Sequence, residues 1–264
     1  MDPRSAKKKN QGRRAVPATD SPPTLAISGV TATIRLCRPA AHNRIDPDDI
    51  PVVRAHLAAI AEHADVRMVV ITGTGGRTFS SGYTLEAIQK RLDRSFEDLL
   101  DALERFPLPT LCALNGSVYG GATDLALCCD FRIGVRGSRM FMPAARFGLH
   151  YYPGGLRRYV AALGATQAKR LFLTAQTLDA AEMLRIGFLT ELVDRRRLAA
   201  RIAAYAAALE DCASGVVSSM KHQIDAIAGG DGDAKQSRTE YETSLQSVEL
   251  RRRLAALTRE RARR

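Results

Sequence analysis

A single carboxylate lies in an apolar run that follows two glycines. The segment NGSVYGGATDLALCC, residues 115–129, has Asp124 as its one charged residue. Such a carboxylate can act as a general acid or base where it faces a substrate. It can also be an ordinary first-turn residue, which a helix dipole stabilises by a few tenths to about 1 kcal/mol. The chemistry of Asp124 therefore depends on the elements that position it.

Two turns rich in glycine follow apolar runs of the strand type. They are FSSGY, residues 79–83, and NGSVYGG, residues 115–121. Glycine permits positive φ and a close approach of the backbone to a ligand, and the first N–H groups of a helix after such a turn have no partner within the helix. Two N–H groups that converge on one oxygen stabilise an oxyanion, and each donor is worth about 2.7 to 4 kcal/mol of barrier. The spacing predicts either this pair of donors or two ordinary turns.

A third candidate group lies in GLHYYPGG, residues 148–155. Histidine is a common acid or base at physiological pH, and a tyrosine hydroxyl can donate a hydrogen bond. We therefore take His150 as a candidate catalytic residue, with Tyr151 and Tyr152 beside it. The alternative is that the histidine is structural and the tyrosines narrow a pocket.

The elements that carry these turns alternate between strand and helix. Residues 24–39 alternate apolar and polar side chains, as in a hairpin. Continuous apolar runs predict buried strands, at residues 66–75, 107–116 and 130–135. Helical patterns separate them, at residues 46–63, 95–106 and 122–129. This order predicts an α/β core with parallel strands.

The second half of the sequence is almost entirely helical in pattern. The expected helices lie at residues 164–175, 179–187, 195–212, 215–229 and 244–262. We divide the chain into a disordered basic tail at 1–24, a mixed core at 25–195 and a helical C-terminal region at 196–264.

The net charge of +11 is concentrated at the two ends of the 264-residue chain. Residues 1–24 carry +4 and residues 250–264 carry +6, so the body between them is nearly neutral. The first segment mixes charge, proline and small residues without apolar periodicity, which predicts disorder. We therefore expect no nucleic-acid partner for the body, and RNA binding through the tails stays an alternative.

Composition excludes several other classes of protein. The sequence has no apolar run of the roughly 18 residues that span a bilayer, and no secretory leader at its start. Its five cysteines are an odd number without a repeated CxxC spacing. We expect a globular cytoplasmic protein with no disulfide framework, no metal site and no membrane association.

Four segments resemble, in order and spacing, the signature segments of the enoyl-CoA hydratase/isomerase, or crotonase, superfamily. They are FSSGYTLE, PTLCALNGSVYGGATDLALCCDFRIG, GLHYYPGGLRR and DAAEMLRIGFLTELVD. The resemblance covers about residues 25–264 and implies an α/β fold with a crotonase-like ββα spiral core and a helical C-terminal trimerisation region. It also implies a homo-oligomer, a trimer or hexamer, and an acyl-CoA thioester as substrate, with no cofactor beyond the coenzyme A of that substrate.

The resemblance assigns roles to individual residues. The backbone N–H groups of Tyr83 and Gly121 would form the oxyanion hole, and Asp124 falls where the family's hydratases carry the first of two catalytic glutamates. The second glutamate is replaced by Ala144, which has no proton to give or take. Hydration by two carboxylates is therefore in doubt, and double-bond isomerisation, hydrolysis and decarboxylation are rivals.

The remaining implied roles concern the two ends of the substrate. The acyl pocket would be lined by Tyr83, Ala144, Tyr151 and Tyr152, and candidates for the CoA phosphates are Arg77, Lys90 and Arg261. The expected context is fatty-acid β-oxidation or aromatic-acid breakdown. A pocket filled by the tyrosines would instead indicate a non-catalytic acyl-CoA binder.

Overall fold

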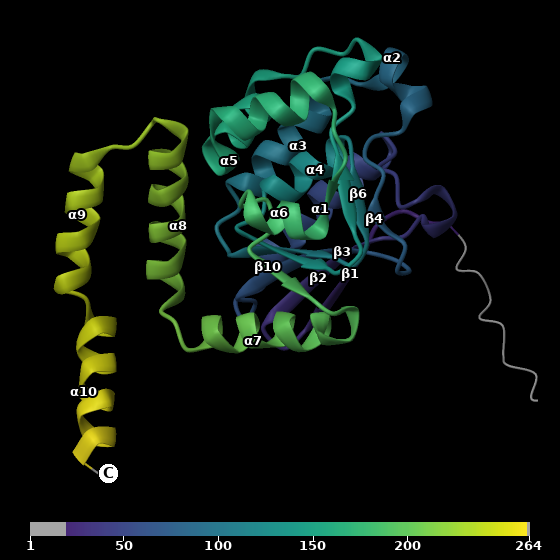
Figure 1. The fold of residues 1–264 in the computed structure, drawn as a ribbon. Coiled ribbons are helices and arrows are strands. Elements are labelled where there is room, and N and C mark those ends of the chain that lie inside the picture. The colour runs from purple at the N-terminus through teal and green to yellow at the C-terminus, as the bar shows by residue number, and fades with distance from the viewer. Residues whose placement is uncertain (1–19, 263–264) are drawn as a thin grey trace, which may run out of the picture.

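The structure is a computed structural model that describes residues 20–262 (Figure 1). It contains two sheets, and the larger has six strands in the order β1-β2-β3-β5-β7-β10. Its strands are β1 (Thr24–Ser28), β2 (Thr31–Leu36), β3 (Met68–Gly73), β5 (Thr110–Leu114), β7 (Phe131–Val135) and β10 (Glu191–Val193). The first two form an antiparallel hairpin, and all other neighbours are parallel. The predicted hairpin and parallel core are confirmed. The strand β10 was not predicted in the almost entirely helical second half, because its three residues are too few to show a strand pattern.

Three strands of a second, smaller sheet each directly follow a central strand of the larger sheet in the chain. Its strands are β4 (Thr78–Ser80), β6 (Ser117–Tyr119), β8 (Arg139–Phe141) and β9 (Leu178–Asp179). Thus β3 leads to β4, β5 to β6 and β7 to β8, and helices follow each pair. Because β4, β6 and β8 pair in parallel, the turns that follow them meet at one edge. This arrangement brings the two glycine turns together.

Helices cover both faces of the larger sheet. One face is covered by α1 (Asp49–Ala61), α3 (Arg94–Glu104), α4 (Gly121–Leu127), α5 (Pro153–Thr174) and α6 (Ala180–Arg185), with the short α2 (Ile88–Arg91) at the periphery. The other face is covered by α7 (Leu198–Glu210). In β3, Val69 and Ile71 pack on the first face while Met68 and Val70 pack on the second. Burial on both faces explains the continuous apolar run in the sequence.

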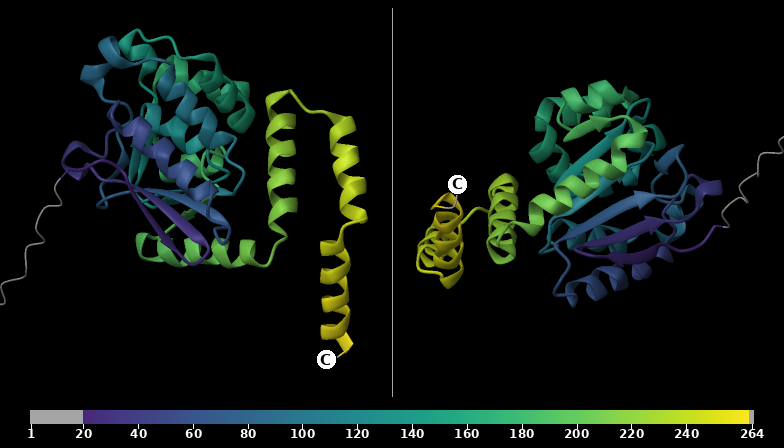
Figure 2. Two further views of the ribbon diagram at one scale, coloured as in Figure 1. Left: turned by 180° about the vertical axis from the view of Figure 1, so that it is seen from behind. Right: turned by 90° about the horizontal axis from the view of Figure 1, so that it is seen from below.

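The C-terminal helices form an arm that projects from the body, as both views in Figure 2 show. They are α8 (Ser214–Gly229), α9 (Ala234–Leu245) and α10 (Val248–Ala262). Only α8 runs beside the body, next to α5, and Lys221 Nζ lies 2.9 Å from Asp130 Oδ2. Large apolar side chains are exposed on the arm at Val216, Met220, Ile224, Ile227, Tyr241, Leu245, Val248, Leu254 and Leu257. None of the helices within residues 20–262 has the length and apolar character to cross a bilayer.

The predicted C-terminal helices are confirmed, but most of α9 was not predicted because its sequence is largely polar. The predicted boundary at residue 195 lies shortly before α7, which starts at Leu198 and packs on the larger sheet. The division into domains stays a prediction. Residues 1–19 of the predicted disordered tail lie outside the described residues.

One carboxyl of the arm gives a prediction about pH. Burial, and then the charge of Asp130, raise the pKa of Asp225 in α8 to about 6. A folded-state pKa above the unfolded value means that ionised Asp225 destabilises the fold as the pH rises from about 4 through 6. We expect Asp225→Asn to raise the free energy of unfolding by about 1 kcal/mol at pH 7.5, allowing for solvent screening, and to leave it unchanged near pH 4.

Thermal unfolding at pH 4, 6 and 7.5 measures this effect. Asp231→Asn, which changes an exposed carboxylate just beyond the same helix, is the control. An equal gain at all three pH values would show that the effect comes from helix propensity and not from the charge of Asp225.

Candidate active site

A cavity of about 700 Å³ opens beside the two glycine turns. Its walls come from residues 41–44, the segment 81–97, the turn at 119–121 and the loop 141–152. Many of its side chains are aromatic: Tyr83, Phe96, Tyr119, Phe141, Phe147, Tyr151 and Tyr152. The cavity therefore suits a largely apolar ligand, with polar groups at a few places.

The backbone of Tyr83 presents its N–H to this cavity. On one side of the segment, Ile45 N–H donates to the carbonyl of Gly82 at 2.8 Å and Thr84 N–H donates to the carbonyl of Ile45 at 3.0 Å. The N–H of Tyr83 points to the opposite side because hydrogen-bonding groups alternate along an extended chain. Within residues 20–262 it has no hydrogen-bond acceptor.

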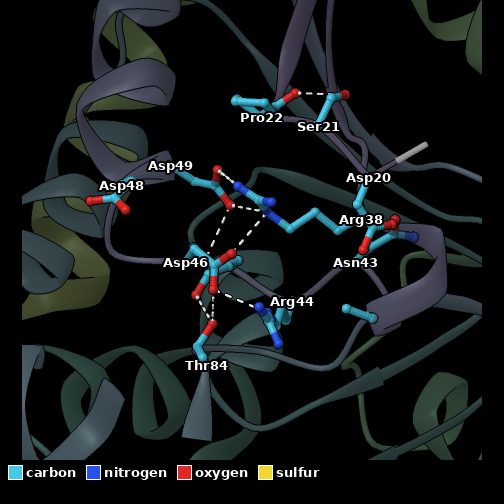
Figure 3. A network of polar contacts seen from close by, with 12 residues as sticks. Asp20, Ser21, Pro22, Arg38, Asn43, Arg44, Asp46, Asp48, Asp49 and Thr84 are labelled. Carbon is cyan, nitrogen blue, oxygen red and sulfur yellow. Dashed lines mark hydrogen bonds and ion pairs between the residues drawn. The ribbon is translucent and has the colours of Figure 1, made fainter. Parts of the chain in front are cut away.

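A network of charged residues fixes the loop that pairs with Tyr83 (Figure 3). The buried Asp49 accepts hydrogen bonds from Arg38 Nη2 at 2.8 Å and from the N–H of Asp46 at 3.0 Å. Asp46 in turn accepts from Arg44 Nε at 3.0 Å and from the hydroxyl of Thr84. The hydrogen bond that Arg38 donates to Asp49 raises the pKa of Arg38, so the guanidinium stays charged. The network holds Ile45 in register with Tyr83.

Gly121 presents a second N–H beside the first, also without an acceptor among residues 20–262. It is the first residue of α4, where an N–H has no partner within the helix. A Cβ on Gly82, which has φ +88°, would lie 2.7 Å from the nitrogen of Gly121, and a Cβ on Gly121 would lie 3.7 Å from the nitrogen of Tyr83. The two turns thus approach as closely as glycine permits. The two N–H groups predicted from the resemblance lie next to each other at the cavity wall.

Asp124 is fully buried and does not line the cavity. Its Oδ1 accepts from Arg158 Nε at 2.9 Å, and its Oδ2 accepts from the hydroxyls of Tyr151, at 3.1 Å, and Tyr152. Both tyrosines line the cavity and direct their hydroxyls to Asp124, so its carboxylate lies behind them, away from the cavity. Its role in proton transfer stays a prediction.

Arg158 is the charge that allows Asp124 to be buried. It also binds Asp101 Oδ1 at 2.9 Å and Glu104 Oε2 at 3.1 Å. Burial, and then the charge of Asp124, raise the pKa of Tyr151 and of Tyr152, so both hydroxyls stay protonated and donate. Arg158 was not predicted from the sequence. Only the need of a buried carboxylate for a positive charge could have suggested such a partner.

The other predicted pocket residues meet at the same cavity. His150 lines it as an exposed side chain, and Ala144 lines it as a buried one. The ring of Tyr83 packs edge-on against Phe96, with centroids 5.3 Å apart, and its hydroxyl donates to the carbonyl of Arg91 at 2.7 Å. The predicted acyl-pocket residues are thus brought together, and their contact with substrate stays a prediction.

The three predicted phosphate ligands do not line this cavity. Arg77 is exposed before β4, Lys90 is exposed in α2, and Arg261 lies near the end of the arm. The arginines that do line the cavity are Arg44 and Arg94. Nothing distinguished them in a sequence with 39 lysines and arginines. Phosphate binding by the predicted residues stays a prediction.

Comparison with curated proteins gives relatives that act on acyl-CoA. A crotonyl-CoA hydratase from Syntrophomonas wolfei is 30% identical over 177 residues, which are 63% of this chain and 67% of the relative. An (E)-benzylidenesuccinyl-CoA hydratase from Thauera aromatica is 26% identical over 217 residues, which are 80% of this chain and 84% of the relative. Both relatives are named as hydratases.

Comparison with solved structures and family models agrees. An enoyl-CoA hydratase from Bacillus anthracis superposes with a TM-score of 0.81 at 21% identity, and the match covers 91% of this chain and 97% of that one. This superposition confirms the crotonase-type fold expected from the resemblance. A family model described as Enoyl-CoA hydratase/isomerase matches residues 27–252. The chain belongs to the enoyl-CoA hydratase/isomerase family.

Proposed function

We propose that the cavity binds an acyl-CoA thioester and stabilises its enolate, with the thioester oxygen accepting hydrogen bonds from the N–H groups of Tyr83 and Gly121. The observation that supports this is the pair of adjacent N–H groups without acceptors, among the described residues, at the wall of an apolar cavity. Donors fixed in this way stabilise charge as it develops on the oxygen. No cofactor is needed beyond the coenzyme A of the substrate.

The reaction proposed is of the hydratase/isomerase type. Ala144 removes one of the two carboxylates with which the family's hydratases bracket a water, which favours reactions that need a single base. A shift of a double bond needs one base that moves a proton from C2 to C4. Hydration with one carboxylate, hydrolysis and decarboxylation are the alternatives on the same enolate, and a non-catalytic acyl-CoA binder is the alternative of another class.

A panel of thioesters tests the reaction. The purified protein is incubated with enoyl-, 3-hydroxy-, 3-keto- and aryl-CoA thioesters, and products are followed by mass spectrometry. A product with a shifted double bond or with added water would support the proposal. Release of free CoA would instead indicate hydrolysis, and release of carbon dioxide would indicate decarboxylation. Binding of every thioester without turnover would contradict an enzymatic role. Asp124→Asn and His150→Ala report on the two groups predicted to transfer protons.

The aromatic lining predicts a preference among acyl groups. Aromatic pairs contribute about 0.5 to 1.5 kcal/mol beyond burial of area, and Tyr119 and Phe141 pack edge-on in the wall with centroids 5.4 Å apart. The Thauera aromatica relative is itself named for a benzylidene-substituted acyl-CoA. We expect kcat/KM about tenfold higher for a 3-aryl-2-enoyl-CoA than for a straight-chain 2-enoyl-CoA of equal carbon number. Equal values of kcat/KM would contradict this preference.

The proposal includes a homo-oligomer, a trimer or hexamer, assembled through the exposed apolar residues of the arm, and a cytoplasmic location. Light scattering on the full chain measures the mass, and a monomer would contradict the assembly. Removing residues 1–19, which leaves β1 intact, should leave turnover unchanged. Salt-dependent RNA binding that disappears with this deletion would support the alternative role of the tail.

A further inference from the structure

Three carboxylates line the cavity, and Asp124, which the resemblance singled out, is not among them. They are Glu86, Asp93 and Glu97. Glu86 is exposed, and Asp93 is exposed and caps α3 by accepting from the N–H of Ser95 at 2.8 Å. Glu97 is half-buried and has no hydrogen bond or ion pair to any other group within residues 20–262. Among the three carboxylates, Glu97 is therefore the one that is partly buried from solvent and has no hydrogen-bond or ion-pair partner among residues 20–262.

We propose that Glu97 transfers the proton in this site, and that Asp124 acts as a positioning residue. The inference rests on the proposed enolate chemistry. It assigns to α3 the base that the resemblance placed in α4.

The position of Glu97 follows from the charges on one face of α3. Glu97, Asp101 and Glu104 are spaced by four and three residues, so they share a face of the helix. Arg158 binds the second and third of them, at 2.9 and 3.1 Å. No such partner among the described residues holds Glu97, which lies at the end of the row that borders the cavity. Its carboxylate is therefore available to a ligand.

The first turn of α3 also lies next to the proposed oxyanion hole. A Cβ on Gly121 would lie 3.0 Å from Cζ of Phe96, the residue before Glu97. A base on this turn and the donors of Tyr83 and Gly121 would thus face the same end of a bound thioester, as enolate formation requires.

Asp124 is poorly suited to the same task. Both of its oxygens already accept hydrogen bonds, from Arg158 and from two tyrosine hydroxyls. The carboxylate is also fully buried and does not line the cavity, so it makes no direct contact with a ligand there. The arrangement instead fixes the positions of Tyr151 and Tyr152, whose rings line the cavity.

The proposed step is a balanced proton transfer. The C2–H bond of the thioester breaks, its proton moves to the carboxylate of Glu97, and its electron pair forms the C1–C2 double bond of the enolate. The negative charge passes to the thioester oxygen, which accepts from the two N–H groups. Glu97 then returns the proton to C2, or to C4 when the substrate is a 3-enoyl thioester. No further reactant is required.

Hydrogen exchange at C2 in D₂O tests this step together with turnover. The substrate is a 3-enoyl-CoA, deuterium at C2 and C4 is followed by mass spectrometry, and thioester binding is measured by calorimetry. We expect Glu97→Gln to lower exchange and kcat at least about 100-fold while Kd stays within about threefold. Glu97→Asp should recover part of the rate. Asp98→Asn, which makes the same change at the next, exposed position of α3, is the matched control and should leave the rate unchanged.

The outcomes separate this inference from the proposed function. Exchange by the unmodified chain that Glu97→Gln leaves intact would overturn the role of Glu97 alone. A higher Kd with unchanged kcat would also overturn it, because Glu97 would then only bind. Neither exchange nor turnover of any thioester by the unmodified chain would overturn the proposed function, and the inference with it.

Discussion

Replacing Gly121 with proline is expected to lower kcat/KM for the active thioester by about 100- to 1,000-fold, the loss typical for removal of one oxyanion donor. Proline has no N–H, and it is well tolerated at the first position of a helix, which Gly121 occupies in α4. The preceding Gly120, with φ +53° and ψ −135°, lies outside the α region that a following proline disfavours. The exchange therefore removes the donor with little demand on the backbone.

Gly121→Ala is the matched control. Its Cβ would meet the ring of Phe96 at 3.0 Å, so it introduces crowding while it keeps the N–H. We expect a loss clearly smaller than that of the proline variant, and thermal unfolding should show both variants folded. Equal losses would mean that crowding near Phe96 and not the missing donor limits the reaction. Unchanged kcat/KM in the proline variant would contradict the oxyanion hole.

The parts of the fold that the sequence predicted are those with a repeating pattern. β3, β5 and β7 have both faces buried, so their runs are apolar throughout, and α3 shows the periodicity of a helix with one buried face. The strands of the smaller sheet have two or three residues each, too few for any period. Their existence depends on pairing between distant segments, which no local pattern contains.

The same distinction applies to the site. The glycines at 82, 120 and 121 were visible because a tight turn restricts the residue type. The partner of Asp124 was not, because Arg158 lies 34 residues further along the chain and its sequence context matches that of many surface arginines. Glu97 could not be predicted for a related reason, because a carboxylate on an amphipathic helix is expected to belong to its solvent-exposed face. Only the packing of α3 beside the cavity distinguishes it.

Replacing Arg158 with methionine is expected to lower the free energy of unfolding by about 3–5 kcal/mol, the usual cost of leaving a buried charge without its partner. Arg158 is 2% exposed and Asp124 is 0% exposed, so water cannot take the place of the guanidinium. For a chain of this size the midpoint of thermal unfolding should fall by about 10 °C.

Arg157→Met makes the same change at the neighbouring position, which is also paired with Glu104 but is about one-third exposed. An ion pair so open to solvent contributes at most about 1 kcal/mol, so this variant should lose little. If Arg158→Met costs no more free energy of unfolding than Arg157→Met, the buried ion pair is not what holds Asp124.

A double variant, Asp124→Asn with Arg158→Met, tests the cause of the loss. It should be more stable than Arg158→Met alone if the unpaired charge of Asp124 causes the loss. The double variant also lacks the carboxylate that holds the hydroxyls of Tyr151 and Tyr152. If its stability recovers while its KM stays raised, Asp124 has two separate roles, one in stability and one in shaping the acyl site.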